Sequence, residues 1–215
     1  MMVFCIRYKF SSLITRCEMS LQKQAKTLSK TQIQFVSEFL LSGRNGIRNH
    51  TIFLLSVKAG LRAKEIASLK WLYVLDANGE LDTHINLPNI ASKGKSGRVI
   101  PIHPDLRESL VKLYESSLRD GVLGSEYVVT TERSPNTSPQ AIVNLFHNLY
   151  KRLGLVGCSS HSGRRTFITN ISRNISKVGG SMRDVQYLSG HSSLQTTQRY
   201  IEGDSQSRVK VVGLL

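Results

Sequence analysis

Cysteines are few in this sequence, and neither they nor the histidines are spaced as metal ligands. The three cysteines, Cys5, Cys17 and Cys158, are odd in number and show no redox-like spacing, so we expect no disulfide framework and a reducing, cytoplasmic environment. The six histidines have no partner at helical ligand spacing and no acidic cluster beside them. Any chemistry is therefore predicted to need no metal.

Long apolar runs and acidic residues are also scarce. No run approaches the roughly 18 apolar residues that a membrane span needs, and the apolar start at Met1 is interrupted by Arg7 and Lys9, so we expect no membrane insertion. Only 15 Asp and Glu stand against 29 Lys and Arg, which gives a net charge of +14. This excess favours a polyanionic partner, and charge alone does not distinguish nucleic acid from an anionic membrane surface.

The length of 215 residues allows one full-sized domain with extensions. Residues 1–28 lack sustained periodicity and are left out of the fold as a basic, disordered extension, within which Met19 is an alternative start. Residues 1–60 hold nine Lys and Arg against two acids, which fits either a phosphate-gripping arm or a solvated tail. We place the folded domain at residues 29–201 and a short tail at residues 202–215.

Hydrophobic periodicity predicts a mainly helical domain. A capping box at Ser29 and Gln32 opens the first helix, which ends near Gly43. An almost wholly apolar run over residues 52–59 predicts a buried helix that stops at Gly60. Further helices are predicted over residues 63–69, after Pro104, from Ser138 to Gly154, and as short pieces between Ser160 and Ile201 that break at Gly179-Gly180 and Gly190.

Three short apolar segments predict a small antiparallel sheet. They cover residues 71–75, 81–87 and 98–102. A turn over residues 77–79, Ala-Asn-Gly, joins the first two segments, and the polar loop 92–97 joins the last two. The expected fold class is α+β, mainly helical, with one three-stranded antiparallel sheet.

Two basic motifs are placed to meet an anion. Arg62 follows the buried helix, and Glu65 can hold its guanidinium by a charge-assisted hydrogen bond, although such a pair alone is more often a surface ion pair. His161 and Arg164 lie one helical turn apart at a helix start, where both can face one phosphate. A solvated basic helix start has the same pattern.

His191 and Tyr200 complete an ordered set of motifs. Tyr200 lies nine residues after His191, and either residue alone is usually a packing residue. The chain carries, in order, Gly-Leu-Arg-x-x-Glu, a lysine-bearing hairpin loop, His-x-x-Arg, Gly-His and this tyrosine. Together they supply the cations, the acid and the nucleophile that metal-free phosphodiester cleavage needs. In this order, over about residues 28–201, the chain resembles the tyrosine recombinase, or phage integrase, family.

The resemblance implies the catalytic-domain fold of that family and a phosphate clamp. Arg62 and Arg164 hold the non-bridging oxygens of the scissile phosphate, and bidentate arginines suit this role better than lysines. His191 donates a hydrogen bond to the same phosphate. Glu65 orders the site.

The resemblance also implies a nucleophile and the groups that move protons. Tyr200 forms a 3′-phosphotyrosyl link, and His161 accepts its proton. Lys93 protonates the 5′ leaving oxygen, with Lys95 as the rival assignment. No ATP, metal or other cofactor is needed. Three residues are expected to bind DNA outside the catalytic set: Lys95, Arg165, which stands where many relatives have histidine, and Arg199.

The function implied by the resemblance is site-specific recombination or integration of double-stranded DNA, as in mobile elements. The implied assembly is a homotetramer on paired sites, with an accessory DNA-bending protein as a candidate partner, in the cytoplasm and on the nucleoid when bound. With fewer than thirty residues before the predicted domain, we expect a catalytic domain without the family's clamp domain, a layout similar to that of fimbrial-switch invertases. Two alternatives stay open: an impaired integrase remnant that acts as a DNA-binding module, and type IB topoisomerase-like activity. The tail at residues 202–215 either docks into a neighbouring protomer or packs on its own domain.

Overall fold

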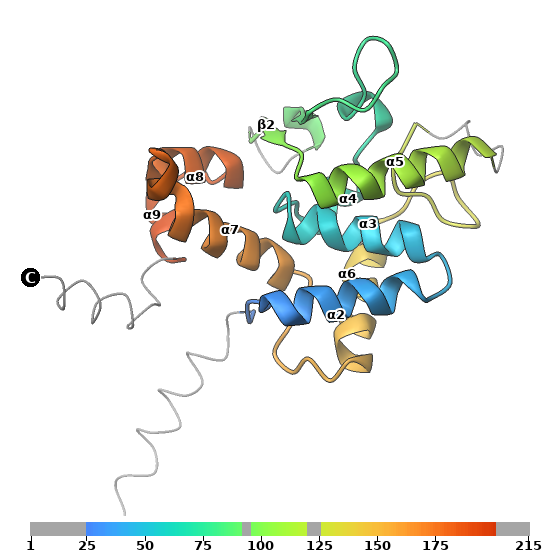
Figure 1. The fold of residues 1–215 in the computed structure, drawn as a ribbon, viewed down its shortest axis with the longest axis horizontal. Coiled ribbons are helices and arrows are strands. Elements are labelled where there is room, and N and C mark those ends of the chain that lie inside the picture. Colours follow the sequence, from blue (N-terminus) through green and yellow to red (C-terminus); the bar gives the residue numbers. More distant parts are fainter. Residues whose placement is uncertain (1–24, 92–95, 120–125, 201–215) are drawn as a thin grey trace, which may run out of the picture.

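The computed structural model describes residues 25–91, 96–119 and 126–200. Helices dominate this part of the chain, as the periodicity predicted, and Figure 1 shows α2 to α6 stacked on one side with α7 to α9 on the other. The α-helices are α2 (Lys30–Leu41), α3 (Gly46–Val57), α4 (Ala63–Ala67), α5 (Pro104–Arg119), α6 (Pro139–Arg152), α7 (Ser162–Asn174), α8 (Met182–Ser189) and α9 (Leu194–Gln198). Short 3-10 helices are η1 (Trp71–Tyr73), η2 (Asn89–Ala91) and η3 (Ile175–Val178).

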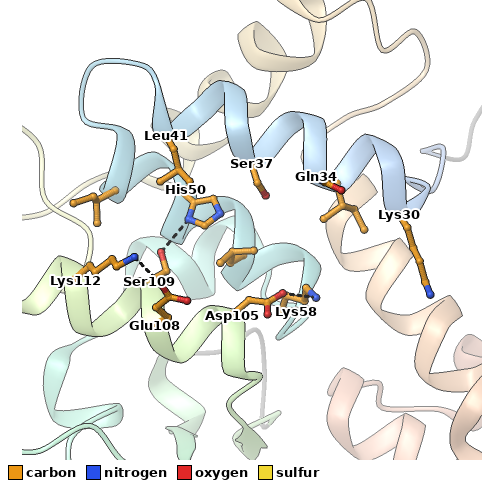
Figure 2. Close-up of a pocket in the computed structure, with 13 residues that line it drawn as sticks. Lys30, Gln34, Ser37, Leu41, His50, Lys58, Asp105, Glu108, Ser109 and Lys112 are labelled. Carbon is orange, nitrogen blue, oxygen red and sulfur yellow. Dashed lines mark hydrogen bonds and ion pairs between the residues drawn. The ribbon is translucent and has the colours of Figure 1, made fainter.

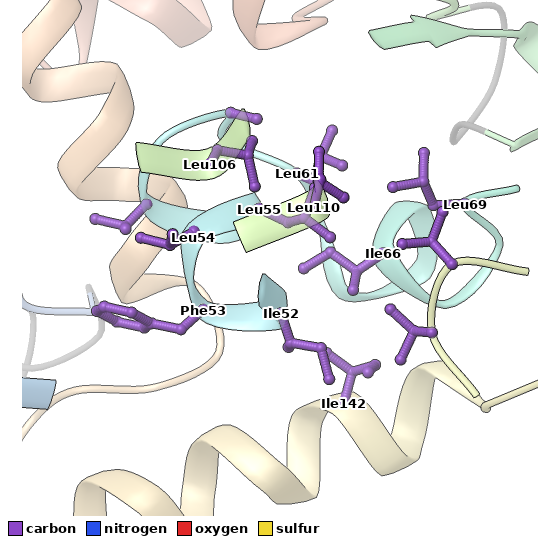
Figure 3. Packing of buried hydrophobic residues seen from close by; sticks show 14 of the residues in the cluster. Ile52, Phe53, Leu54, Leu55, Leu61, Ile66, Leu69, Leu106, Leu110 and Ile142 are labelled. Atoms are coloured by element: carbon purple, nitrogen blue, oxygen red, sulfur yellow. The ribbon is translucent and has the colours of Figure 1, made fainter. Parts of the chain in front are cut away.

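Helix α3 lies at the centre of the fold. Every residue from Thr51 to Val57 is buried, and α2, α5 and α7 all pack against this helix. Figure 3 shows its apolar side chains among those of α4, α5 and α6, with Ile142 of α6 beside Ile52. A helix that is apolar all round is stable only when it is covered on every side. The predicted buried helix is therefore confirmed, and its end is a rigid support for the residues that follow.

Gly60 turns the chain from α3 towards α4. Its φ of +66° lies in the left-handed region, which glycine adopts without steric cost. A Cβ at this position would lie 2.4 Å from Cδ1 of Phe167 on α7, so the close approach of α7 also requires glycine. The turn places Arg62 at the N-cap of α4.

The N-terminal boundary lies a few residues earlier than the sequence predicted. The capping box at the start of α2 is confirmed, since Ser29 Oγ accepts from the backbone of Gln32 and the Gln32 side chain accepts from the backbone of Ser29. Leu28, which the sequence analysis left in the extension, is buried in the core. Its N–H donates to Thr166 Oγ1 at 2.8 Å. The packed chain therefore includes Leu28, and residues 1–24 lie outside the described residues.

The sheet in the described residues has two strands, so the prediction of three strands is wrong. Strand β1 (His84–Leu87) pairs antiparallel with β2 (Arg98–Pro101), with Ile85 opposite Ile100. The segment at residues 71–75 instead begins as the 3-10 helix η1. Trp71 N–H donates to Glu126 O, and the indole packs on Tyr114 with ring centroids 4.8 Å apart. Leu75, at the end of the segment, forms only an isolated antiparallel bridge with Leu81. Burial of the large aromatic ring of Trp71 therefore takes the place of a regular strand here.

The glycine breaks near the C-terminal end are confirmed. Gly179 (φ +76°) separates η3 from α8, and Gly190 (φ +58°) is the C-cap of α8. Helix α8 lies against α7, α9 and β2. This packing brings the end of α8 to the loop after α3, which is more than a hundred residues away in the chain.

Candidate active site

Arg62 is held by Glu65 on the next turn of α4. Arg62 Nη1 donates to Glu65 Oε1 at 2.8 Å, and the backbone N–H of Arg62 donates to Oε2 at 2.8 Å. Glu65 is fully buried, whereas 24% of the Arg62 side chain is exposed. The pair is therefore no surface ion pair: a buried carboxylate orients a guanidinium whose edge reaches solvent.

Arg98, the first residue of β2, is a second partner of Glu65 that the sequence analysis missed. Its Nη1 and Nη2 donate to the two oxygens of Glu65, each at 3.1 Å. Only 1% of the Arg98 side chain is exposed. Arg98 shares the buried face of β2 with Ile100, and a charge at such an inward position must be paired. That inward-facing charge was the available sequence signal.

Two arginines keep Glu65 ionised. Burial by itself raises the pKa of this carboxyl, but the hydrogen bonds and charges of Arg98 and Arg62 outweigh burial and bring the pKa below its ordinary value. The carboxylate is therefore a fixed negative charge between two guanidiniums at neutral pH.

Arg164 reaches the same region from the first turn of α7. It is 4% exposed, and it donates to Gly60 O at 2.6 Å and to Ser189 O at 2.5 Å. Burial, with the nearby charge of Arg62, lowers the pKa of Arg164 to about 9, so the side chain still carries its charge at neutral pH. Arg164 thus ties the turn after α3 to the end of α8.

The last turn of α8 is the common support of all three arginines. Its three consecutive carbonyls, those of Leu188, Ser189 and Gly190, accept hydrogen bonds from Arg98 Nε, Arg164 Nη2 and Arg62 Nη2 respectively. Carbonyls at a helix C-terminus lack intrahelical partners and attract cations. Three guanidiniums therefore surround one carboxylate and one helix end, which leaves excess positive charge beside a solvent-accessible edge.

His161 lies at the start of α7 and is exposed to solvent. Partial burial, with the charges of Arg164 and Arg62, lowers its pKa below the ordinary value. The imidazole is therefore neutral at neutral pH and has a nitrogen free to accept a proton.

His191 and Tyr200 lie ring against ring. Their centroids are 5.5 Å apart and the planes differ by 22°. His191 Nδ1 is hydrogen bonded to Thr197 Oγ1 at 3.0 Å. Burial, with the charges of Arg164, Arg62 and Arg98, lowers the pKa of His191 to about 4. This imidazole is also neutral at neutral pH.

The predicted residues line two hollows that share Thr196. One, of about 390 Å³, is lined by His161, Arg164 and Tyr200 together with both additional arginines, Arg165 and Arg199. The other, of about 890 Å³, is lined by Arg62 and His191. Both are open to solvent and rich in basic groups, which suits a large anion. Lys93 and Lys95 lie outside the described residues, although Ser96 and Gly97, just after their loop, line the larger hollow.

Arg165 also contacts Tyr200. Its guanidinium carbon lies 5.9 Å from the centre of the Tyr200 ring, within the range of a cation–π contact. Arg199 is exposed beside it. Of the two arginines predicted to bind DNA, Arg165 therefore lies against the tyrosine ring and Arg199 is exposed to solvent.

A groove between α2, α3 and α5 differs in character from these hollows. It has a volume of about 490 Å³ and shares no lining residue with them. Figure 2 shows that both of its carboxylates are paired with lysines, Asp105 with Lys58 at 2.9 Å and Glu108 with Lys112 at 2.6 Å. Because two of its three lysines are neutralised locally, this groove is less suited to an anion than the two hollows are.

Two kinds of feature are absent from the described residues. No group of three or more His, Cys, Asp or Glu there is arranged to hold a metal ion. No helix in this part of the chain is long and apolar enough to cross a membrane.

Comparison with known sequences identifies related proteins. The sequence model of the phage integrase family matches residues 26–207. Tyrosine recombinase XerA of Thermococcus onnurineus is 33% identical over 157 residues, which are 71% of this chain and 50% of the relative. The chain spans about half the length of the first curated relatives that it matches.

Comparison with solved structures shows the same fold. The crystal structure of XerA recombinase superposes with a TM-score of 0.69 at 22% identity, and the match covers 91% of this chain and 68% of the other. The XerH recombinase bound to a palindromic difH substrate, in a post-cleavage complex, gives a TM-score of 0.67 at 20% identity, over 86% of this chain and 51% of the other.

Proposed function

Because the chain belongs to the phage integrase family, we propose that it cleaves and rejoins double-stranded DNA at specific sites through a covalent bond to Tyr200. The observation that carries the proposal is the grouping of Tyr200 and His191 with Arg62, Arg164 and His161 along two adjoining hollows. These residues come from four separate segments of the chain, and packing of the core alone does not require their side chains to meet.

The proposed reaction is a transesterification. The Tyr200 hydroxyl attacks the scissile phosphorus, the bond from phosphorus to the 5′ oxygen breaks, and a 3′-phosphotyrosyl bond forms. His161, neutral at neutral pH, accepts the tyrosine proton. The phosphotyrosyl bond conserves the energy of the cleaved ester, so rejoining to a 5′ hydroxyl needs no ATP.

The arginines act on the phosphate in this proposal. Arg62 and Arg164 donate to the non-bridging oxygens, where negative charge grows in the transition state. Their remaining donors are already fixed by Glu65, Gly60 and Ser189. Guanidiniums held in this way need little rearrangement during the reaction, so their free N–H groups are already oriented for the phosphate.

We assign the leaving-group acid to Lys93, with Lys95 as the alternative. Loss of the correct lysine slows cleavage of ordinary DNA. The rate recovers when the 5′ bridging oxygen is replaced by sulfur, because a thiolate leaves without protonation. Comparison of Lys93→Ala with Lys95→Ala on both substrates decides between them.

The stacking of Tyr200 on His191 supports attack by the chain's own tyrosine. Tyr200 lies against the histidine of the same chain, so we propose that each protomer cleaves with its own tyrosine. Exchange between two DNA sites then takes four protomers, and we propose a homotetramer on paired sites. An accessory DNA-bending protein remains a candidate partner, and the proposed location is the cytoplasm, on the nucleoid when DNA is bound.

The test is capture of the covalent intermediate. The protein is incubated with nicked duplexes made from the DNA that flanks its gene, and the products are separated under denaturing conditions. We expect a protein–DNA adduct with the natural chain and with the control Tyr73→Phe, and none with Tyr200→Phe. An adduct formed by Tyr200→Phe, or none formed by the natural chain, contradicts the proposal.

The same test separates the two alternatives. DNA binding without an adduct indicates a DNA-binding module. An adduct with relaxation of supercoils, but without exchange between two sites, indicates topoisomerase-like activity.

A further inference from the structure

Arg98 is a deeply buried cation beside the candidate site, and the hydrogen bonds of its guanidinium are internal. Its Nε donates to Leu188 O at 3.0 Å, and its Nη1 donates to Ser96 O at 3.1 Å, in addition to the two bonds to Glu65. An arginine side chain has five N–H donors, and four of these are used here. With 1% of its side chain exposed, Arg98 has no surface to offer to DNA.

One side of Arg98 faces the stem of the lysine-bearing loop. Its own backbone opens β2, and its guanidinium holds the carbonyl of Ser96. The next residue of the stem, Gly97, donates its N–H to Asn89 Oδ1 at 2.8 Å. A Cβ at Gly97 would lie 2.8 Å from Asn89 N. The point at which the loop rejoins the sheet is therefore closely fixed.

The other side of Arg98 faces the phosphate-clamp residues. Glu65 receives Arg98 and Arg62 on the same Oε1 atom. Leu188, whose carbonyl accepts from Arg98 Nε, lies three residues before His191. A Cβ at Gly190 would lie 2.7 Å from Arg98 Nη1. The guanidinium thus fills the space between α4, α8 and the loop stem.

A gain in folding stability does not explain why a charged residue is buried at position 98. A buried ion pair gains little or nothing over an apolar pair of similar volume, because both charges lose their hydration. A planar guanidinium that donates in three directions, however, fixes the relative position of two backbone segments and a carboxylate. The geometry therefore favours a role in orientation.

We propose that Arg98 is a positioning residue that holds the strand stem at Ser96, Glu65 and the end of α8 in one register, so that Arg62 meets the phosphate in a fixed orientation. This inference rests on the proposed function. Arg98 acts through Glu65 and through backbone carbonyls, and touches no substrate.

The test compares Arg98→Lys and Arg98→Met in single-turnover adduct formation. We expect both variants to bind the nicked duplex with unchanged affinity, since Arg98 is inaccessible. We expect adduct formation to slow by about 10–100-fold, the usual effect of a lost supporting contact behind a reactive group. Lysine does not restore the rate because one ammonium cannot bond both Glu65 oxygens and the Leu188 carbonyl together.

The pH dependence of adduct formation distinguishes the effect of the Arg98 charge from the effect of the guanidinium shape. In Arg98→Met the carboxyl of Glu65 loses its main stabilising partner while it stays buried, so its pKa rises and adduct formation falls at a higher pH than in the natural chain. In Arg98→Lys the positive charge beside Glu65 remains. The pH at which adduct formation falls on the acid side therefore stays near that of the natural chain, although the rate is low. A residue that only supports the fold gives no such difference between the two variants.

Two further variants distinguish a loss of positioning from a loss of the folded state. Arg98→Met combined with Glu65→Gln removes the unpaired buried charge, so we expect the urea midpoint to recover while the adduct rate stays low. Arg48→Met is the matched control, because Arg48 is a part-buried arginine that donates to Thr130 O at the opposite end of α3. We expect this control to react at the natural rate.

Three outcomes overturn the inference while leaving the proposed function standing. They are an unchanged adduct rate in Arg98→Met, a rate that recovers together with stability in the double variant, and a loss explained by weaker DNA binding. If the natural chain itself forms no adduct, the proposed function fails first, and the inference fails with it.

Discussion

The ring of Tyr200 stacks on the ring of His191 at a centroid distance of 5.5 Å and an angle of 22°. This contact ties the last described residue of the chain to the end of α8, whose carbonyls hold three arginines. Burial of the His191 ring, together with the charges of Arg164, Arg62 and Arg98, lowers its pKa to about 4. The imidazole against the tyrosine ring is therefore neutral at neutral pH.

We predict that His191 makes stability depend on pH. Burial and three arginines lower its pKa from 6.5 to about 4 in the folded chain, so between these values the unfolded chain binds a proton that the folded chain does not. The free energy of unfolding therefore falls as pH decreases from 6.5 towards 4. With allowance for solvent screening, we expect a loss of about 1–2 kcal/mol. Urea unfolding at pH 7 and pH 5 measures it, and His191→Gln must show a smaller difference than the natural chain.

Arg164→Ala is predicted to destabilise the fold more than Arg62→Ala. Loss of Arg164 leaves the carbonyls of Gly60 and Ser189 unpaired in a buried place, at a cost of about 2–3 kcal/mol. Loss of the partly exposed Arg62 leaves Glu65 paired with Arg98. We expect both variants to lose adduct formation. Equal urea midpoints for the two variants contradict this account of the burial of Arg164.

Gly163→Ala is predicted to force α7 away from α3. A Cβ there would lie 2.4 Å from Ser56 Oγ and 2.9 Å from Ser56 Cβ, and both elements belong to a close-packed core, so we expect a loss of about 1–3 kcal/mol. The additional change Ser56→Gly makes space for the new methyl group and should restore part of the lost stability. Gly43→Ala is the control, since its Cβ meets nothing closer than 3.4 Å. A stable Gly163→Ala variant is incompatible with the helix contact described here.

Arg165 and Arg199 are predicted to differ in effect although both line the hollow of Tyr200. Arg165→Gln removes the cation from the tyrosine ring, which is worth about 0.5–1 kcal/mol, so adduct formation slows a few-fold in the bound complex. Arg199→Gln removes an exposed charge, so it weakens DNA binding and lowers the salt dependence of that binding by about one phosphate contact. Titrations at several salt concentrations and single-turnover rates distinguish the two. Identical behaviour of the two variants rules out the ring contact.

Local patterns predicted the helices well because their signals are short-range. The capping box at Ser29 and the left-handed glycines Gly60 and Gly190 depend on neighbours within a few residues. The third strand was predicted wrongly because the position of Trp71 depends on Tyr114 and Glu126, which are far away in the chain. Propensity cannot describe such a contact.

The residue types and their order were enough, through a family resemblance, to indicate Arg62, His161, Arg164, His191 and Tyr200 as one set. Only the tertiary structure identified Arg98, and only it showed that a single helix end holds three arginines through Leu188, Ser189 and Gly190. The physical reason is that backbone carbonyls leave no mark in a sequence. Which carbonyls lack partners, and which guanidiniums reach them, is decided by how α8 packs against α7, α9 and β2.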